Sequence, residues 1–291
     1  MTRAAEKQDI GRPRAGGNSD RPVAGSGRIT RGHGVLALAA RYFSTWHFLC
    51  TIEANVREGS EVLDFGCGQG TSYFPSRFHT TGFDVDFETV RAVSGPYQGA
   101  VTGDVAQLPF RAETFDAAVS SFVLEHLPFE HAVATFDELR RVLRPHGVLI
   151  CLCDLECDHP LLSLVRRFFP DGYQEAFIKV PGHLGLRRER TWAELLTGAG
   201  FDILEWRLMS RFPVLDHAPW TYFASAPRVP KPLQWIGKAA HRVNRWGRVA
   251  ELCDVVVVAA DDVFRSVLPR SWAYRLLFVA RKTGTRPSPA T

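Results

Sequence analysis

A short apolar segment that runs directly into closely spaced glycines constrains the fold of this chain more than any other feature. Residues 61–65 (Glu-Val-Leu-Asp-Phe) have the composition of a buried strand, and Gly66-Cys67-Gly68-Gln69-Gly70 follow at once. A strand that ends in such a turn lets the backbone approach a ligand closely. The GxGxG spacing differs from the GxGxxG of dinucleotide sites, which argues against a nicotinamide-dependent oxidoreductase.

Strands and helices are predicted to alternate on both sides of this turn. Periodic apolar residues predict helices at 35–56, from the turn to Arg77, from about Phe87, at 129–143 and at 191–199. Further strands are predicted at 79–84, just before Gly103-Asp104, and at 115–120, 148–153, 201–209 and 274–281. Alternation of this kind predicts an α/β fold with a doubly wound, mostly parallel sheet.

The chain divides into a basic tail and one large domain. Residues 1–31 carry seven basic and three acidic residues and few apolar ones, so we expect them to be disordered. The domain is expected over 32–283, with cap insertions at about 154–190 and 211–270 that could wall a substrate pocket, and a flexible end at 284–291. Because the tail accounts for the net charge of +4, no nucleic-acid partner is expected. The first residues lack the apolar run of a secretory signal, which predicts a cytoplasmic location.

The glycine turn resembles the first motif of class I methyltransferases that use S-adenosylmethionine (SAM), in particular the type 11 group. The resemblance continues in order through Gly82-Phe83-Asp84 and residues 103–110, 115–121, 124–127 and 139–147. It covers residues 55–153 well. It implies a Rossmann-like sheet of seven mostly parallel strands with an antiparallel last strand, SAM as the cofactor, and methyl transfer as the activity.

By this resemblance, the turn would pack its backbone against the amino-acid portion of SAM, with Asp64 supporting the loop. Asp84 would accept hydrogen bonds from the ribose hydroxyls, since a carboxylate can accept from both. Asp104 would face the adenine amino group. The alternative for both aspartates is a turn or helix-cap role. The full predicted cofactor set is Asp64, Gly66, Cys67, Gly68, Gly70, Asp84, Val85, Asp104, Val105, Ser121 and Phe122.

Two histidines are candidates for the catalytic step. His126 follows the predicted strand at 115–120, where substrate and methyl group should meet, and an imidazole suits proton abstraction near neutral pH. His183 lies in the first insertion and could belong to a lid over the site. A capping or packing role is the alternative for His126.

A cysteine cluster raises the question of a metal. Cys151, Cys153 and Cys157 follow one another closely, but structural zinc sites usually draw on two separated pairs, and the sequence has no second pair. The apolar alternation around 149–153 predicts the end of a buried strand, where free cysteine is common. We therefore predict no metal.

The second insertion hints at the acceptor. Residues 233–250 predict a basic amphipathic helix with an apolar face of Leu233, Ile236, Ala240, Val243 and Ala250. Such a helix is typical of peripheral membrane contact or of a cap over the core. The aromatic-rich C-terminal third favours a small-molecule or lipid-like acceptor, methylated on oxygen or carbon. A non-catalytic SAM-binding module and a membrane-surface protein are the alternatives.

Overall fold

The computed structural model describes residues 44–71, 73–93, 97–211, 220–245, 256 and 259–284. The predicted basic tail (1–31) and all but one residue of the predicted flexible end (284–291) lie outside these ranges. The predicted helix at 35–56 is described from Ser44 onward. Searched over the described residues, no helix is both long and apolar enough to cross a membrane.

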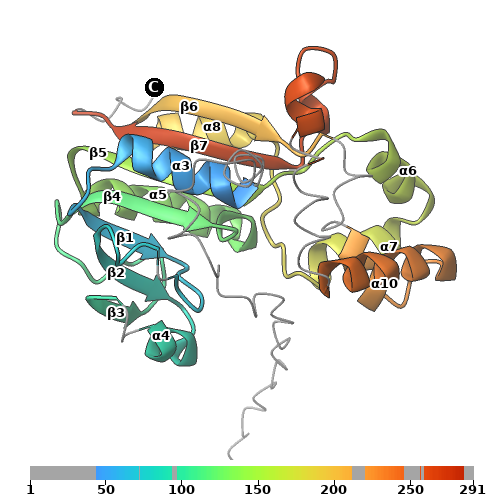
Figure 1. Cartoon of the computed structure of the whole chain (residues 1–291), viewed down its shortest axis with the longest axis horizontal. Helices are drawn as coiled ribbons and strands as arrows, with labels where there is room; N and C mark the ends of the chain where they lie inside the picture. Colours follow the sequence, from blue (N-terminus) through green and yellow to red (C-terminus); the bar gives the residue numbers. More distant parts are fainter. Residues whose placement is uncertain are drawn as a thin grey trace, which may run out of the picture.

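A seven-stranded sheet in the order β3-β2-β1-β4-β5-β7-β6 forms the centre of the molecule (Figure 1). Strands β1 to β5 run parallel, and β7 is antiparallel to both β5 and β6. The prediction of a Rossmann-like, mostly parallel sheet with an antiparallel last strand is confirmed. The strands are β1 (Glu61–Phe65), β2 (His79–Asp84), β3 (Gly99–Thr102), β4 (Phe115–Ser121), β5 (Leu143–Asp154), β6 (Phe201–Met209) and β7 (Arg275–Lys282).

Both faces of the sheet are covered, which explains why most side chains of its central strands β1 and β4 are buried. On one face, α5 (Phe129–Val142) and α8 (Glu189–Gly198) bury Phe136, Leu139 and Trp192. On the other face, α3 (Ser44–Asn55) buries Phe48 and Ile52. The remaining helix of the sheet domain, α4 (Phe87–Val93), contacts β2 and β3.

A separate lobe, here called the cap lobe, stands beyond the carboxyl ends of β4 and β5 (Figure 1). It has its own apolar core around Phe177, Trp220 and Phe223. Its elements come from both predicted insertions: α6 (Pro160–Phe168), α7 (Pro170–Tyr173), the π-helix η2 (Gln174–Lys179), the 3-10 helix η3 (Tyr222–Ser225) and α10 (Lys231–Arg245).

One local prediction is wrong. The segment before Arg77 forms turns in place of a helix, and its Tyr73 and Phe74 pack into the core beside α3. In α10, Ile236 of the predicted apolar face is 47% exposed, so this face does not cover the core as a whole. The buried face passes through Gly237, because the backbone of η3 lies so close that a Cβ there would be 2.4 Å from Ala224 N.

A buried carboxylate joins β1 to the segment after the glycine turn. The Tyr97 hydroxyl donates a 2.7 Å hydrogen bond to Oδ2 of Asp64 and accepts one of 3.1 Å from Thr71 N. Burial raises the pKa of Asp64 to about 7, more than the Tyr97 hydroxyl lowers it. Asp64 therefore supports the turn through Tyr97, a residue that the sequence did not single out.

We predict that Asp64→Asn changes how stability depends on pH. The unfolded chain releases this proton near pH 4, whereas the native chain keeps it until about pH 7, so the wild type binds more protons when folded. Its unfolding free energy should then fall as pH rises from about 4 to 7, by roughly 3–4 kcal/mol from this group. The variant should lose that component, as measured by urea unfolding at several pH values. Asp202→Asn, at an exposed position of β6, is the control; equal pH dependence in wild type and Asp64→Asn would contradict the prediction.

Candidate functional site

The glycine turn after β1 presents bare backbone at the carboxyl edge of the sheet. Gly66 and Gly68 have φ angles of +68° and +51°, a region that side chains disfavour. A Cβ on Gly66 would lie 2.1 Å from Cγ2 of Val123, whereas one on Gly68 would meet nothing within 4 Å. Packing thus requires the first glycine, and the second leaves open space beside the backbone for a ligand.

Cys67, in the middle of the glycine turn, helps to fix the shape of that turn. The Cys67 side chain is buried, and burial followed by the charge of Asp64 raises its pKa to about 12, so it is a neutral thiol. Its N–H donates to Phe83 O at 3.1 Å, and its carbonyl accepts from Gly70 N at 2.8 Å. Both backbone groups of Cys67 are therefore engaged within the protein.

Asp84 lies beside the glycine turn, at the end of β2. Its Oδ2 accepts from Gly68 N at 3.0 Å and its Oδ1 from Asp86 N at 3.0 Å. The adjacent Val85 is 78% exposed, an apolar surface next to a carboxylate. The structure thus places Asp84, the residue predicted to bind the ribose, next to the glycine turn. Gly68 and Asp84, which are hydrogen-bonded, are 16 residues apart in the chain.

Asp104 follows β3 and is half exposed. Its Oδ1 accepts from Ala106 N at 2.9 Å, as in a turn, and its Oδ2 lies 3.5 Å from Nε2 of His131. Val105 packs partly against the core. The turn role of Asp104 is present in the structure, and its contact to adenine stays a prediction.

The end of β4 completes this edge. Ser121 is exposed, and Phe122 has φ +58° while its N–H donates to Leu152 O at 2.7 Å. The Arg275 guanidinium lies 5.5 Å from the centre of the Phe122 ring. The predicted contact of Ser121 and Phe122 with SAM stays a prediction.

Sheet order spreads these groups along one line. Because the strands lie in the order β3-β2-β1-β4 and are parallel, their carboxyl ends present Asp104, Asp84, the glycine turn and Ser121 in that spatial sequence. Ligands of open α/β sheets bind across such ends. A long, flexible ligand with an adenine at one end and an amino acid at the other, as in SAM, fits the order of acceptors and bare backbone.

A cluster of buried polar side chains lies next to the β4 end, at the base of the cap lobe. Arg275 Nε is 3.5 Å from Oδ1 of Asp154, and both side chains are nearly inaccessible. Glu125 is fully buried, and burial followed by the charge of Asp154 raises its pKa well above its usual range. Tyr222 and Tyr274 lie beside them, and burial followed by the charge of Asp154 raises the pKa of both.

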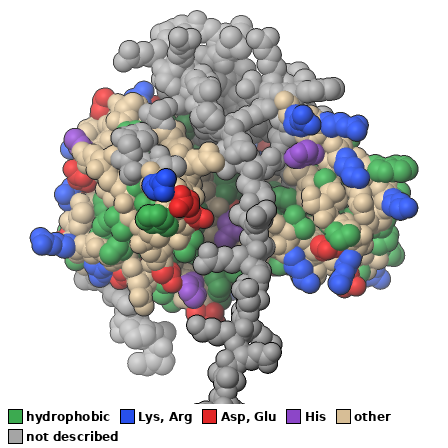
Figure 2. All heavy atoms as spheres, turned by 90° about the horizontal axis from the view of Figure 1, so that it is seen from below, with side chains coloured by type: hydrophobic (Ala, Val, Ile, Leu, Met, Phe, Trp, Pro, Cys, Tyr) green, Lys and Arg blue, Asp and Glu red, His purple; other side chains and the backbone are tan. Residues whose placement is uncertain are grey.

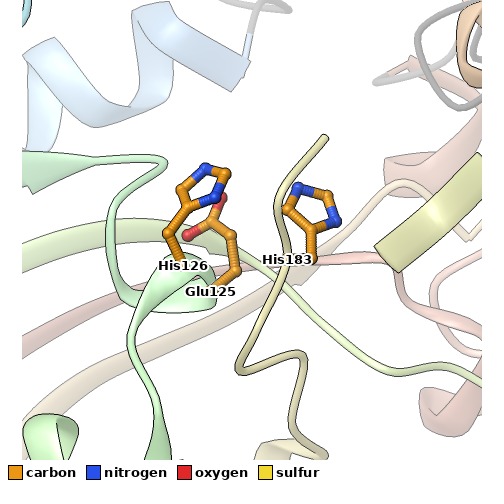
Figure 3. A group of neighbouring side chains, drawn as sticks. All are labelled: Glu125, His126 and His183. Carbon is orange, nitrogen blue, oxygen red and sulfur yellow. The ribbon is translucent and has the colours of Figure 1, made fainter. Parts of the chain in front are cut away.

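The two predicted catalytic histidines lie together at this cluster. His126 contacts Gly182, which is 56 residues further along the chain and directly precedes His183. Their ring centroids are 5.0 Å apart (Figure 3). Nδ1 of His126 is 3.0 Å from Gly182 O, and Nδ1 of His183 is 2.9 Å from Phe177 O. A carbonyl can only accept, so each Nδ1 carries the hydrogen and each Nε2 keeps its lone pair. Burial, then the neighbouring His126, lowers the pKa of His183 to about 4, so it is neutral.

Five residues of this cluster were not predicted as site residues: Glu125, Asp154, Tyr222, Tyr274 and Arg275. Glu125 could have been found, because it precedes His126 after a predicted strand end. Asp154 ends β5, and the others come from the start of β7 and from the cap lobe, whose approach depends on tertiary packing. The prediction that the cysteines mark a buried strand is confirmed for two of them. Cys151 and Cys153 are fully buried free thiols on β5.

Comparison with known proteins agrees with this geometry. Residues 63–151 match a family model described as a methyltransferase domain. A tRNA (carboxymethyluridine(34)-5-O)-methyltransferase of Arabidopsis thaliana is 33% identical over 37% of this chain and 27% of its own length. A demethylmenaquinone methyltransferase of Staphylococcus saprophyticus is 31% identical over 44% of this chain and 58% of its own length. The chain thus spans only part of the length of these two relatives.

A solved structure extends the likeness of fold to most of the chain. Geranyl diphosphate C-methyltransferase from Streptomyces coelicolor has a TM-score of 0.52, with 10% identity, over 82% of this chain and 81% of that one. Residues 63–151 therefore form a methyltransferase domain of the type 11 group, and the fold around them is shared with a solved methyltransferase structure.

Proposed function

We propose that this chain transfers the methyl group of SAM to an oxygen or carbon atom of a small, hydrophobic or lipid-like acceptor. SAM supplies a methyl group on a positively charged sulfur, so the protein's task is to hold the nucleophile in line with it in a dry site. The glycine turn and Asp84 would hold the cofactor. The histidines and the buried cluster would receive the acceptor.

One contact supports this division of labour most directly. Val123 packs against Gly66 in the cofactor turn, and it immediately precedes the 3-10 helix η1 (Leu124–His126), which carries Glu125 and His126. A cofactor on the glycine turn would therefore lie beside the histidine pair. Each Nε2 lone pair could accept a hydrogen bond from an acceptor hydroxyl, and His126 could take its proton.

The nature of the acceptor is inferred from the surroundings of the cluster. The cap lobe lines it with Tyr222, and Tyr173 and Phe177 stack 4.9 Å apart behind it. A relative's name gives demethylmenaquinone, a small molecule, as the acceptor of that protein. A nucleic-acid acceptor is the second candidate, because another relative is named as a tRNA methyltransferase.

The cap lobe also offers a surface for an anionic bilayer. In α10, Trp235 is 68% exposed, next to exposed Lys231, Lys238 and Arg242, and the helix contains no acidic residue. Figure 2 shows Lys and Arg side chains at the edge of this lobe, with hydrophobic ones between them. Tryptophan with flanking cations is typical of interfacial helices, and such contact would suit a lipid-like acceptor.

We predict that Asp84→Ala weakens cofactor binding. The carboxylate shapes the turn through Gly68 N and would accept from the ribose, so its loss should cost about 1–3 kcal/mol in the affinity for SAM and for S-adenosylhomocysteine. Calorimetric titration measures both, with NADH as a ligand expected not to bind and Asp202→Ala as the matched variant. Well-folded wild-type protein that binds neither sulfur ligand would refute the proposed function.

The acceptor class can be tested with radiolabelled SAM. Label from the methyl group should pass to the organic extract of a lipid and quinone mixture and not to total tRNA. Transfer to tRNA alone would favour the nucleic-acid acceptor over the lipid-like one. The radioactivity counted in each fraction distinguishes the two acceptor classes.

For the surface, Trp235→Glu should reduce cosedimentation with vesicles that contain anionic lipid, because it removes an interfacial anchor and adds repulsion. Phe87→Glu, which alters a comparably exposed apolar residue on α4, should leave cosedimentation unchanged. Equal vesicle binding by wild type and Trp235→Glu would rule out this face as the contact.

A further inference from the structure

Three potential ligand side chains converge from two distant segments of the chain. Glu125 and His126 belong to η1, and His183 lies in the loop after η2. One ligand atom from each of them lies within 4.8 Å of the others. Figure 3 shows the two imidazole rings side by side, with the Glu125 carboxylate next to the ring of His126.

The two histidines are oriented as ligands usually are. Each Nδ1–H donates to a backbone carbonyl, of Gly182 for His126 and of Phe177 for His183. Such bonds fix the ring and the tautomer, and a histidine that binds a metal almost always has one on its other nitrogen. Both free Nε2 lone pairs are thereby left for a common partner.

The Glu125 carboxylate also requires a partner. It is fully buried, and neither of its oxygens makes a hydrogen bond of good geometry with a described residue; the nearby backbone N–H groups of Glu125 and Asp154 lower its pKa less than burial raises it. An unpartnered polar group at such depth is costly and rare. Arg275 lies 3.5 Å from Asp154, and its positive charge lowers the pKa of Glu125 less than burial and the charge of Asp154 raise it.

Hydrogen bonds to backbone carbonyls hold the loop that carries His183 against η1. Gly185 N donates to Glu125 O at 2.8 Å, and Arg187 donates to Leu127 O at 2.9 Å and to Gly185 O at 2.8 Å. A Cβ on Gly185 would lie 2.1 Å from Leu127 O. The loop that carries His183 is therefore fastened against η1, which fixes the relative positions of the three side chains.

We propose that Glu125, His126 and His183 bind a first-row divalent transition metal ion such as Zn²⁺, Mn²⁺ or Co²⁺. Two imidazole nitrogens and one carboxylate suit these ions and not Mg²⁺ or Ca²⁺, which prefer oxygen ligands. Three protein ligands leave a coordination position open, as in catalytic metal sites. Resting on the proposed function, we assign that position to an oxygen of the methyl acceptor, which the ion would orient toward the cofactor. With the ion bound, the Nε2 lone pair of His126 is occupied, so the ion would take the place of His126 in binding the acceptor hydroxyl.

The spacing of the ligand atoms defines the movement that binding requires. A tetrahedral site with bonds of about 2.1 Å has edges of about 3.4 Å, shorter than the 4.8 Å limit found here. The three side chains would therefore have to move closer together when the ion binds.

Metal binding is testable without any methyl acceptor. Protein treated with a chelator and dialysed should bind about one equivalent of Co²⁺ or Zn²⁺, followed by the visible absorption of bound Co²⁺ and by calorimetry. His183→Ala should weaken the affinity about tenfold or more, since loss of a ligand exceeds the loss of an outer-shell partner. His241→Ala, which removes an exposed histidine from α10, is the matched control and should bind normally. Glu125→Gln, which keeps the shape but not the charge, should also weaken binding.

Titration of the same preparations with SAM separates this inference from the proposed function. SAM binding by protein that takes up no metal, or metal affinity that His183→Ala leaves unchanged, would overturn the metal site while the methyltransferase proposal stands. Metal binding by protein that does not bind SAM would overturn the proposed function while the metal site stands. Circular dichroism of each variant confirms that a loss of metal is not a loss of fold.

Discussion

The close packing of Val123 on Gly66 is the contact on which the rest of the site depends. With no Cβ at Gly66, the segment after β4 can approach the turn after β1, and a side chain there would clash at 2.1 Å. The cofactor turn lies on one side of this contact. On its other side begins η1, with Glu125 and His126. A missing side chain in one motif thus sets the distance between the two halves of the proposed reaction site.

Buried charge is concentrated at the same edge and is unevenly compensated. Asp64, under the turn, has a hydroxyl partner in Tyr97, and burial still raises its pKa to about 7. Glu125 has no such partner among the described residues, and Asp154 lies near Arg275. Proteins rarely keep such groups in their interior without a use for them. Their position at the strand ends, where ligands of this fold bind, connects the cost of burial to the proposed function.

In the proposed function, the sheet holds the cofactor and the cap lobe helps to form the site for the acceptor. It supplies His183 and Tyr222 to the cluster and the exposed Trp235 to the outer surface. Its core is separate from the two cores that flank the sheet. Substrate choice can therefore change through this lobe without disturbing the glycine turn, in keeping with the many chemistries that one fold can carry.

The sequence by itself determined the sheet and the glycine turn at its carboxyl edge, because both depend on local signals. Apolar strands, glycines at positive φ and carboxylates at strand ends follow one another between 61 and 121, and the strand at 201–209 was predicted to the residue. Local periodicity placed Ile236 on an apolar helix face without deciding whether that face is buried, and it missed the turns at 73–77, since packing against η3 and α3 decides both. Only the tertiary structure decided which distant groups meet: His183 reaches His126 because backbone hydrogen bonds fasten its loop to η1, and Arg275 reaches Asp154 because β7 pairs with β5. Contacts between segments so far apart in the chain leave no periodic trace in the sequence, since they arise from the order in which strands and loops pack.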